Sequence, residues 1–577
     1  MCPAIILKKG ILIMKTSAQL EAMLREIDHK GYPAYKSLKG IYQFGSWQLS
    51  IDHVQGDPFA SPSRLTIHIT DKASGFSREY WSSADRRTAF CDFLLRLFEK
   101  AVERYSFQAK GSGKSGAIFT SHPGQEVLAR TACTVRNDTI LMRFEAGFPA
   151  NGRTINAREL HKILFDYLPR CAESTLFARS VDRKALEAAL DLYEDQQALR
   201  AYLIQNGFAA FVADGSVLPR KSGVSSAPMK GAVPFSSPDS LRISVDLPHR
   251  GRITGMGIRA GITLITGGGY HGKSTLLKAL EAGVYNHIAG DGREFVITDA
   301  SAVKLRAEEG RVVKQVNISP FINHLPGGKD TTVFSTEDAS GSTSQAAAVM
   351  EGIEAGARLF LIDEDTCATN FMVRDELMQR VIAPDKEPIT PFLARIRPLF
   401  SDLRISTILV VGSSGAFFEP ADCIIQMDNY RTFDITKRAK AEAAACGPAP
   451  LPETDFHFPA CRRRKYEPAR GKTRRDDRPP KIKTQGKDSL FYDKSLIDLR
   501  YVEQIVCEEQ TKALGHILLY LNTHPDSSRT LAEQTAAVWK KLTEEGLESI
   551  SSSSDCPPFM AMPRIQEIFA CINRCRF

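Results

Sequence analysis

The fold of this chain is decided by the stretch Gly267-Gly268-Gly269-Tyr270-His271-Gly272-Lys273-Ser274-Thr275. An apolar run before it predicts a buried strand, and an apolar, Lys-containing run after it predicts a helix. Glycines let successive backbone N–H groups point at a triphosphate, and the helix N-terminus adds partial positive charge. We expect all nine residues to bind nucleotide, with Lys273 on the β- and γ-phosphates and Ser274 on Mg²⁺. The alternative is a plain glycine-rich turn.

Two acids end a second buried strand, Leu359-Phe360-Leu361-Ile362-Asp363-Glu364. In a phosphate-loop protein, Asp363 is expected to hold Mg²⁺ through its water shell and Glu364 to polarise the attacking water. The alternative is a pair of acids at a strand end without a catalytic role. With the loop, this strand predicts an α/β domain in which strands and helices alternate.

Composition indicates a multidomain protein inside a cell. The 577 residues are 43% hydrophobic and 25% charged, with a formal net charge of +8. No apolar run is long enough to span a membrane, so no membrane partner is expected. Twelve cysteines without a CxxC pair predict reduced thiols, and therefore the cytoplasm.

Changes in composition and periodicity divide the chain into five segments, with either Met1 or Met14 as the start. The expected segments are a disposable extension over 1–15, an N-terminal α/β domain over 16–235, the ATPase-like α/β core over 236–446, a basic linker rich in Pro, Lys and Arg over 447–490, and a mainly helical C-terminal domain over 491–577.

A cationic block occupies residues 461–487, which contain twelve Lys and Arg residues and only three acidic residues. Such a block can neutralise many phosphates and predicts salt-sensitive binding of nucleic acid. A solubilising tail, an acidic protein and a membrane surface are the alternatives. The candidate contacts are Arg462, Arg463, Arg464, Lys465, Arg474 and Arg475.

A second glycine-rich segment, Lys110-Gly111-Ser112-Gly113-Lys114-Ser115-Gly116, invites comparison with the first. The full pattern needs a glycine where Gln108 stands, and no clear apolar strand leads into the segment. A solvated loop is therefore the expectation, and a basic loop near phosphate is the alternative.

The residues around the two acids resemble motifs of ABC-class ATPases. Residues 363–370, Asp-Glu-Asp-Thr-Cys-Ala-Thr-Asn, are similar to the Asp-Glu-Pro-Thr-Ser-Ala-Leu-Asp run of that class, whose latter half is the D-loop. This resemblance implies that Asn370 lies at the nucleotide. Upstream, Ser340 and Gly341 resemble the Ser-Gly of the signature Leu-Ser-Gly-Gly-Gln, and Ser342 replaces its second glycine. The signature contacts the γ-phosphate of ATP held by a partner subunit.

Two further positions of that class are matched less well. Gln315 follows Lys273 by 42 residues, a distance that suits the Q-loop glutamine. The switch histidine is missing after residues 407–411, and Ser413 is the nearest match, which predicts slow hydrolysis. No tyrosine stands clearly at the usual adenine-stacking position. The absence of an Asn-Lys-x-Asp guanine selector favours ATP over GTP. A small-molecule kinase is a weaker alternative, because kinases of that kind have a lid and no signature before the Asp-Glu strand, so no small-molecule substrate other than ATP is expected.

The combination of these runs with Val316-Asn317-Ile318-Ser319-Pro320-Phe321 resembles the stand-alone "predicted ATPase of the ABC class" family, which lacks transporter domains. The resemblance implies a head-to-tail homodimer with two ATPs at its interface and a basic opening suited to nucleic acid, RNA in particular. One hypothesis is therefore an ATP-driven clamp on RNA. The other is a regulatory binding module that uses ATP as a structural ligand and binds a protein partner.

Overall fold

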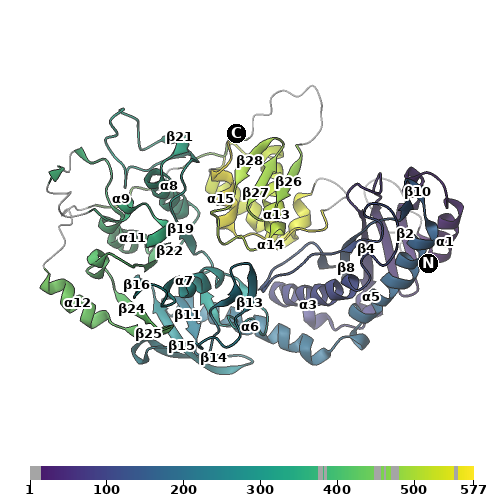
Figure 1. Ribbon diagram of the computed structural model, residues 1–577, viewed down its shortest axis with the longest axis horizontal. Coiled ribbons are helices and arrows are strands. Elements are labelled where there is room, and N and C mark those ends of the chain that lie inside the picture. Colours follow the sequence, from purple (N-terminus) through teal and green to yellow (C-terminus); the bar gives the residue numbers. More distant parts are fainter. Residues whose placement is uncertain are drawn as a thin grey trace. The chain divides into compact units, whose positions relative to one another are not determined.

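The computed structural model describes residues 14–374, 381–382, 386–446, 456–460, 463–468, 480–551 and 557–576. The chain divides into two compact units (Figure 1). The first consists of Met1–Glu194 and Leu547–Met562, and the second of Asp195–Gly546 and Pro563–Phe577.

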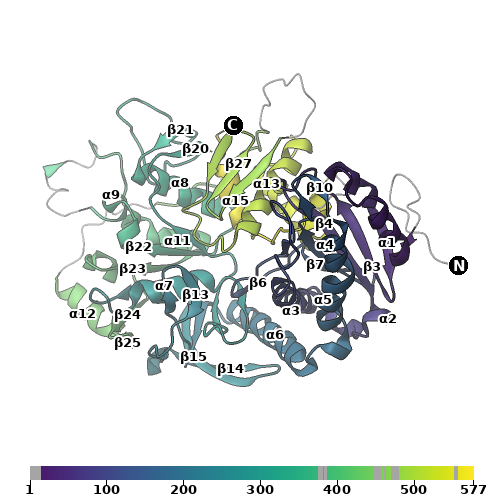
Figure 2. The ribbon, with the colours of Figure 1, turned by 45° about the vertical axis from the view of Figure 1, so that its right-hand side comes forward.

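The first unit is built on a mixed sheet with strand order β1-β2-β3-β4-β8-β5, in which β7 also pairs with β8 (Figure 2). Its strands are β1 (Lys15–Thr16), β2 (Gly40–Phe44), β3 (Trp47–His53), β4 (Ser63–Thr70), β5 (Ile118–Phe119), β7 (Cys133–Arg136) and β8 (Thr139–Ala146). Alternating burial along β2 and β8 marks sheet faces of different exposure. Strand β1 pairs in parallel with β2, so Lys15 belongs to the sheet and not to the disposable extension expected over residues 1–15.

Helices α1 (Ser17–Glu26) and α3 (Ala84–Glu103) pack on this sheet. Behind them, α4 (Ala157–His161) packs on α1, and α5 (Leu168–Thr175) packs on α3. The Ser83 side chain caps α3 by accepting a hydrogen bond from the Arg86 N–H. Phe90, Leu94 and Phe98 are fully buried at helical spacing on α3, which packs on β7 and α5.

The second unit contains the sheet that carries the predicted motifs, with order β19-β22-β23-β16-β24-β25. Its strands are β16 (Ile262–Thr266), β19 (Val303–Leu305), β22 (Leu359–Asp363), β23 (Ser406–Val410), β24 (Cys423–Asp428) and β25 (Arg431–Asp434). All neighbours pair in parallel except β24 and β25, which form an antiparallel hairpin. Strands β22 and β23 are buried at every residue, as parallel strands with both faces covered require.

Helices lie in the connections between these parallel strands. They include α7 (Lys273–Ala282), α8 (Gly341–Glu354), α9 (Thr369–Met372) and α11 (Ile396–Leu403), whereas α12 (Thr436–Ala445) follows β25. Helix α7 packs on β22 and β23, and α11 packs on β16 and β23. A hairpin of β20 (Arg311–Val316) and β21 (Phe334–Ala339) leads into α8.

An antiparallel sheet of order β14-β15-β11-β18 completes the core of the second unit. Its strands are β11 (Phe208–Ala213), β14 (Arg242–Leu247), β15 (Gly251–Arg259) and β18 (Val296–Thr298). Strand β11 forms ladders with both β15 and β18. This pairing places β11 in the second unit, although the sequence assigned residues 16–235 to the N-terminal domain. Helix α6 (Arg183–Gln205) contains the division between the units.

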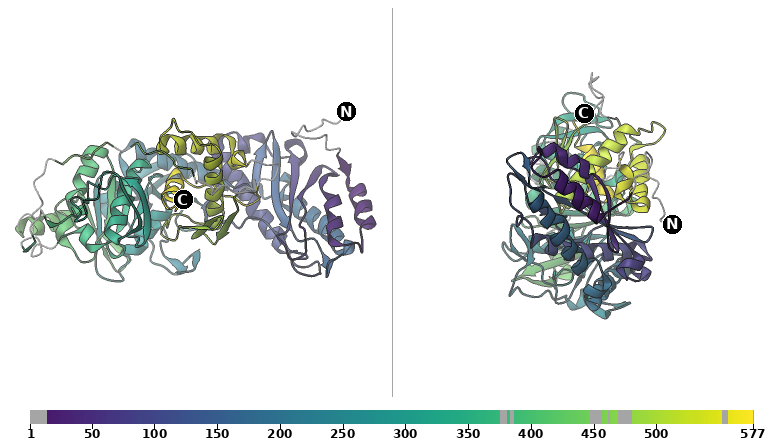
Figure 3. Two further views of the ribbon diagram at one scale, coloured as in Figure 1. Left: turned by 90° about the horizontal axis from the view of Figure 1, so that it is seen from above. Right: turned by 90° about the vertical axis from the view of Figure 1, so that its right-hand side faces the viewer.

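The C-terminal region is helical with a small antiparallel sheet, shown in yellow in Figures 1 and 3. Its elements are β26 (Ile482–Gln485), β27 (Ser489–Tyr492), β28 (Ser495–Asp498), α13 (Glu508–Thr523), α14 (Leu531–Glu545) and α15 (Ile565–Asn573). Helix α13 packs on β26 and β27 through Gly515, where a Cβ would lie 2.5 Å from Ile482 Cγ2. Residues 482–485 were expected to be linker, but they form strand β26 and pair with β27.

The segment Leu547–Met562 belongs to the first unit, although the sequence predicted one C-terminal domain over 491–577. The Thr131 N–H donates to the Met560 carbonyl oxygen at 2.9 Å. The carboxylate of Glu548 pairs with Arg136 and Arg143 and has only 7% of its side chain exposed. These contacts bind the segment to the end of the β7–β8 ladder. None of the described helices is both long and apolar enough to cross a membrane.

Candidate functional site

The glycine-rich stretch forms a loop between β16 and α7, as the sequence predicts. Gly267 has φ 138°, and a Cβ there would lie 2.2 Å from the Met427 carbonyl oxygen, so a side chain does not fit. Gly272, with φ 99°, precedes the first residue of α7. The Lys273 Nζ donates to the carbonyl oxygens of Gly267 and Gly268 at 2.8 Å each, which places its ammonium group across the loop.

The turn of the β24–β25 hairpin lies beside this loop. The Asn429 N–H donates to His271 Nδ1 at 2.9 Å, and the Tyr430 N–H donates to the His271 carbonyl oxygen at 3.2 Å. Strand β24 pairs in parallel with β16 up to Thr266, which lies opposite Gln426, and β24 then runs on to Asp428 at the hairpin turn. Sequence reasoning missed this hairpin, because nothing in a glycine-rich motif indicates which later strand will pair with the strand before it.

The two predicted acids lie at the C-terminal end of β22. Asp363 is buried, and its Oδ1 accepts a hydrogen bond from the Asp365 N–H at 3.4 Å. One oxygen of Glu364 accepts the Gly412 N–H at 2.7 Å and the Ser413 N–H at 3.1 Å. The other accepts the Ser413 hydroxyl at 3.1 Å. The carboxylate of Glu364 is therefore oriented by three donors.

Strand β23 explains why these donors reach Glu364. It lies between β22 and β16 in the sheet, with Val410 opposite Asp363 and Ile265 opposite Val410. The C-terminal ends of the three parallel strands therefore meet at one edge, the usual place for a ligand in such a sheet. The phosphate loop, Ser413 and Glu364 share this edge, and Ser413 occupies the position between the loop and the acid.

The residues at this edge fit Mg²⁺ and a triphosphate by their chemistry. Ser274 is exposed on the first turn of α7, and Asp363 supplies a carboxylate at the end of β22. Hydroxyl and carboxylate oxygens are the ligands that Mg²⁺ takes beside phosphate. The loop offers backbone N–H groups, the N-terminus of a ten-residue helix and the charge of Lys273.

The residues that resemble the signature begin helix α8. Ser340 is its N-cap, and its hydroxyl oxygen accepts the Thr343 N–H at 3.4 Å. Gly341 approaches the D-loop, since a Cβ on it would lie 3.7 Å from the Ala368 Cβ. Ser342 also lies on this first turn, with its hydroxyl 3.4 Å from that of Ser340. The exposed N-terminus of α8 therefore stands next to the start of the D-loop.

The D-loop is fastened to α8 by a buried glutamine that sequence reasoning did not single out. The Gln345 side chain accepts the Ala368 N–H at 3.0 Å and donates to Cys367 Sγ at 2.9 Å. Burial raises the pKa of the Cys367 thiol to about 12, so this cysteine stays a neutral partner. Asn370 follows on α9 with an exposed side chain. The signal available in the sequence was a single amide directly before the apolar run Ala346-Ala347-Ala348-Val349.

Gln315 is engaged elsewhere than the Q-loop prediction requires. It lies on β20 with φ 51°, and its Nε2 donates to Glu467 at 2.9 Å. Its backbone N–H donates to the Ser335 hydroxyl at 2.8 Å. The side chain thus contacts the segment expected to bind nucleic acid, and not the phosphate loop. The Q-loop prediction used only the number of residues between Lys273 and Gln315, and it did not foresee that Gln315 lies in the β20–β21 hairpin.

The predicted nucleic-acid contacts have different environments. Arg462, Arg474 and Arg475 lie outside the described residues. Arg463 and Lys465 are exposed, and the Lys465 Nζ donates to the Ser527 carbonyl oxygen at 2.7 Å. Arg464 is buried, with 6% of its side chain exposed, and pairs with Glu354. Arg464 is therefore a structural residue, which corrects its assignment as a nucleic-acid contact.

The second glycine-rich segment is a packed loop and not a phosphate site. The Ser112 N–H donates to the Ala150 carbonyl oxygen, and the Lys114 N–H to that of Pro58. The Gly116 N–H donates to the Gly147 carbonyl oxygen at 3.0 Å. Because these N–H groups already have backbone partners, they do not form an anion-binding concavity.

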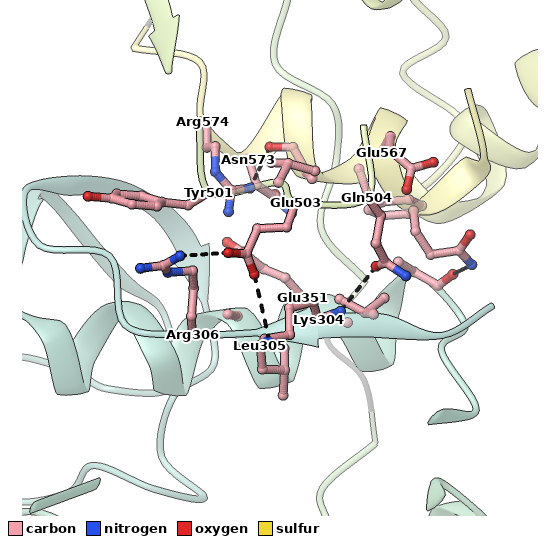
Figure 4. A pocket seen from close by; sticks show the side chains of 18 of the residues that line it. Lys304, Leu305, Arg306, Glu351, Tyr501, Glu503, Gln504, Glu567, Asn573 and Arg574 are labelled. Atoms are coloured by element: carbon pink, nitrogen blue, oxygen red, sulfur yellow. Dashed lines mark hydrogen bonds and ion pairs between the residues drawn. The ribbon is translucent and has the colours of Figure 1, made fainter. Parts of the chain in front are cut away.

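A cavity of about 60 Å³ lies between β19, α8 and the C-terminal region of the second unit. In Figure 4, Arg306 and Lys304 both point to Glu503, at 2.8 Å and 3.9 Å, and the Lys304 N–H donates to Gln504. The volume suits about two water molecules and is far below that of a nucleotide pocket. The cavity is thus part of an ionic contact between the core and the C-terminal region.

Comparison with known proteins finds matches along most of the chain. Three family models match in sequence order: "ATPase of the ABC class N-terminal" over residues 17–179, the "P-loop domain" of ABC_ATPase over 182–457, and the "MRB1590 C-terminal domain" over 481–577. The "Uncharacterized protein MJ1628" of Methanocaldococcus jannaschii is 35% identical over 190 residues, which are 31% of this chain and 42% of that protein. The match thus spans less than half of that relative's length.

A bacterial Atm1-family ABC exporter with ATP bound matches over 42% of each chain at 16% identity, with a TM-score of 0.24, which is too low to support an inference. The ABC_ATPase model covers the phosphate loop and the two acids, and the N-terminal model covers the sheet of the first unit. The chain therefore belongs to the ABC-class ATPases, with a P-loop ATPase domain that follows the N-terminal domain of that class.

Proposed function

We propose that this chain binds MgATP at residues 267–275 and hydrolyses it slowly through Glu364. The observation that carries the proposal is the orientation of the Glu364 carboxylate by Gly412 and Ser413, one strand away from the phosphate loop. A carboxylate fixed at the end of β22 can polarise a water that attacks the terminal phosphate. Membership of the ABC-class ATPases supports ATP hydrolysis in general.

The loop residues have separate roles in this proposal. Lys273 binds the β- and γ-phosphates, and the backbone N–H groups of 267–275 bind the remaining phosphate oxygens. Ser274 and Asp363 would hold Mg²⁺, which when bound neutralises phosphate charge. Ser413 keeps the Glu364 carboxylate in place. A histidine at this position would in addition contact the phosphate. That difference supports slow turnover.

A head-to-tail homodimer is the second part of the proposal. The N-terminus of α8 is exposed, and Ser340 makes its hydrogen bonds within the first turn of that helix. A helix of 14 residues with an exposed N-terminus suits contact with an anion. The resemblance of residues 340–342 to the ABC signature supports ATP bound by a second copy as that anion. Asn370, exposed beside this turn, would face the same interface.

The proposed target of the closed dimer is nucleic acid, with RNA favoured. Arg463 and Lys465 are exposed in the cationic segment, whose full stretch of 461–487 holds twelve basic residues. Their charge supports sequence-indifferent binding that weakens with salt. A regulatory module that keeps ATP as a structural ligand and binds a protein is the second candidate, and it is favoured by Ser413 in place of a histidine.

The test is steady-state ATP hydrolysis by the full chain, with and without single-stranded RNA or DNA. Glu364→Gln is expected to lower kcat by about 10²- to 10⁴-fold. Asp365→Asn, which changes an exposed neighbouring acid, is the matched control and should retain activity. Turnover that rises with RNA and vanishes in Glu364→Gln supports the clamp. Tight ATP binding without turnover under any condition favours the regulatory module.

A further inference from the structure

Two tyrosines with exposed side chains lie at the phosphate-binding loop. Tyr270 is in the loop and is fully exposed, and Tyr430 is in the β24–β25 turn with 57% of its surface exposed. All fifteen tyrosines lie among the described residues, and the others are buried or half-buried. Exposed tyrosines are thus confined to this site, which indicates a surface kept for contact with something other than the chain itself.

The backbone at Tyr430 is unusual for an aromatic residue. Asn429 and Tyr430 have φ 48° and 64°, and they connect the paired residues Asp428 and Arg431. A two-residue hairpin turn with positive φ at both positions prefers Asn-Gly, because a side chain at the second position is disfavoured there. Backbone strain of this kind clusters at ligand sites and active sites. Fold alone therefore does not explain a tyrosine at this position.

The ring of Tyr430 lies against the start of α7. Its Cδ1 atom is 3.2 Å from the position that a Cβ on Gly272 would occupy. The Tyr430 N–H donates to the His271 carbonyl oxygen, which fixes the turn on the loop. An exposed aromatic ring is therefore held beside the last glycine of the phosphate-binding loop.

The order of strands sets the direction in which a nucleotide must lie. Glu364 and Ser413 follow β22 and β23 on one side of β16, whereas the β24–β25 hairpin lies on the other side. A terminal phosphate that is to react must face Glu364. The nucleoside, at the opposite end of the triphosphate, is therefore directed away from the acids and toward the side where Tyr430 stands.

We propose that Tyr430 binds the nucleobase, with its ring stacked on the purine of the nucleotide whose phosphates occupy residues 267–275. This inference rests on the proposed binding of ATP. Aromatic rings stack on bases through π-faces that all bases share, so Tyr430 supplies affinity and little choice between adenine and guanine. An aromatic residue supplied from the hairpin after the acids accounts for the lack of a clear stacking tyrosine in the sequence pattern.

The test compares Tyr430→Gly and Tyr430→Phe with the unchanged chain in calorimetric titrations. Tyr430→Gly removes the ring and creates the Asn-Gly turn that this hairpin prefers, so folding is expected to be retained. The probes are MgATP, MgGTP and inorganic tripolyphosphate with Mg²⁺. Tripolyphosphate reports on the phosphate-binding loop without any base.

Tyr430→Gly is expected to weaken MgATP and MgGTP binding by about 5- to 100-fold, the effect of losing one stacked base. Tyr430→Phe should bind both as the unchanged chain does, and tripolyphosphate should bind all three proteins equally. Unchanged MgATP binding by Tyr430→Gly overturns the inference. If Tyr430→Gly weakens tripolyphosphate binding as much as MgATP binding, the inference is also overturned, because the ring then supports the phosphate-binding loop and does not bind the base. If the unchanged chain binds neither ATP nor tripolyphosphate, the proposed ATP site itself is wrong.

Discussion

Arg464 offers a strong test of the distinction between structural and nucleic-acid-binding cations. Its guanidinium pairs with Glu354 and donates to the Lys314 carbonyl oxygen at 2.8 Å and to Asn573 Oδ1 at 3.0 Å. Only 6% of the Arg464 side chain and 9% of the Glu354 side chain are exposed. Burial raises the pKa of Glu354, and the charge of Arg464 opposes that rise. Removal of Arg464 therefore leaves a buried carboxylate without its counter-charge.

Arg464→Met is expected to lower the free energy of unfolding of the second unit by about 3–5 kcal/mol at neutral pH. A domain of 150–250 residues loses about 2–4 °C per kcal/mol and the larger second unit loses less, so the thermal midpoint should fall by on the order of 3–10 °C. The loss should shrink as pH falls toward 5, because the unpaired Glu354 then takes up a proton at little cost.

The assay is thermal unfolding followed by circular dichroism, with two controls. Arg463→Met changes the exposed neighbour and should shift the free energy by no more than about 0.5 kcal/mol. The double change Arg464→Met with Glu354→Met removes both charges and should recover most of the lost stability. An Arg464→Met midpoint within about 1 °C of the unchanged chain would refute the reasoning and return Arg464 to the candidates for nucleic-acid contact.

Three other changes probe the site and the fold. Ser413→Ala removes a hydroxyl that donates to Glu364 at 3.1 Å, so in steady-state assays kcat for ATP should fall by about tenfold or more with KM nearly unchanged. An unchanged kcat would show that the two backbone donors are enough to orient the Glu364 carboxylate. Gly267→Ala places a Cβ 2.2 Å from the Met427 carbonyl oxygen, and titration with MgATP should show binding lost, whereas retained affinity would contradict the close approach. Burial lowers the pKa of His516 from 6.5 to about 4, so between these pH values the unfolded chain binds a proton that the folded chain does not bind. The contribution of His516 to the free energy of unfolding is therefore complete above pH 6.5 and falls by on the order of 2–3 kcal/mol toward pH 4. Urea unfolding at pH 7 and 5 should show a smaller difference in this free energy for His516→Gln than for the unchanged chain.

The parts of the site that the sequence predicted are those encoded locally. The phosphate loop needs an apolar strand, glycines and a helix start in one continuous stretch, and all three are visible without tertiary contacts. Ser413 was predicted only as the nearest match to the switch histidine, and its contact with Glu364 follows because the parallel strand before it ends at the same edge as β22. The predicted place of Gln315 is not found, since its environment depends on a hairpin whose register shifts along β20 and β21. Tyr430 depends on a strand pairing that no local pattern reveals.

The fold shows the same division between local and distant determinants. Strand β11 is buried at all six residues, and its apolar composition predicts a strand. Its partners β15 and β18 come later in the chain, so the sequence could not show which domain it joins. Arg464 lies in a run of basic residues, and its partner Glu354 lies 110 residues earlier. A charge run predicts solvation of the whole segment and cannot reveal the member that is buried.

Helix α8 physically joins the proposed nucleotide interface to the cationic segment. Its N-terminus carries Ser340, and Glu354 ends it in the buried pair with Arg464. Its 14 residues span about 20 Å. Glu351, one turn earlier, pairs with Arg311 on β20, so two buried ion pairs fix this end of the helix. In the proposed head-to-tail dimer, a displacement of Ser340 would therefore reach Arg464 and the exposed cations on either side of it through α8.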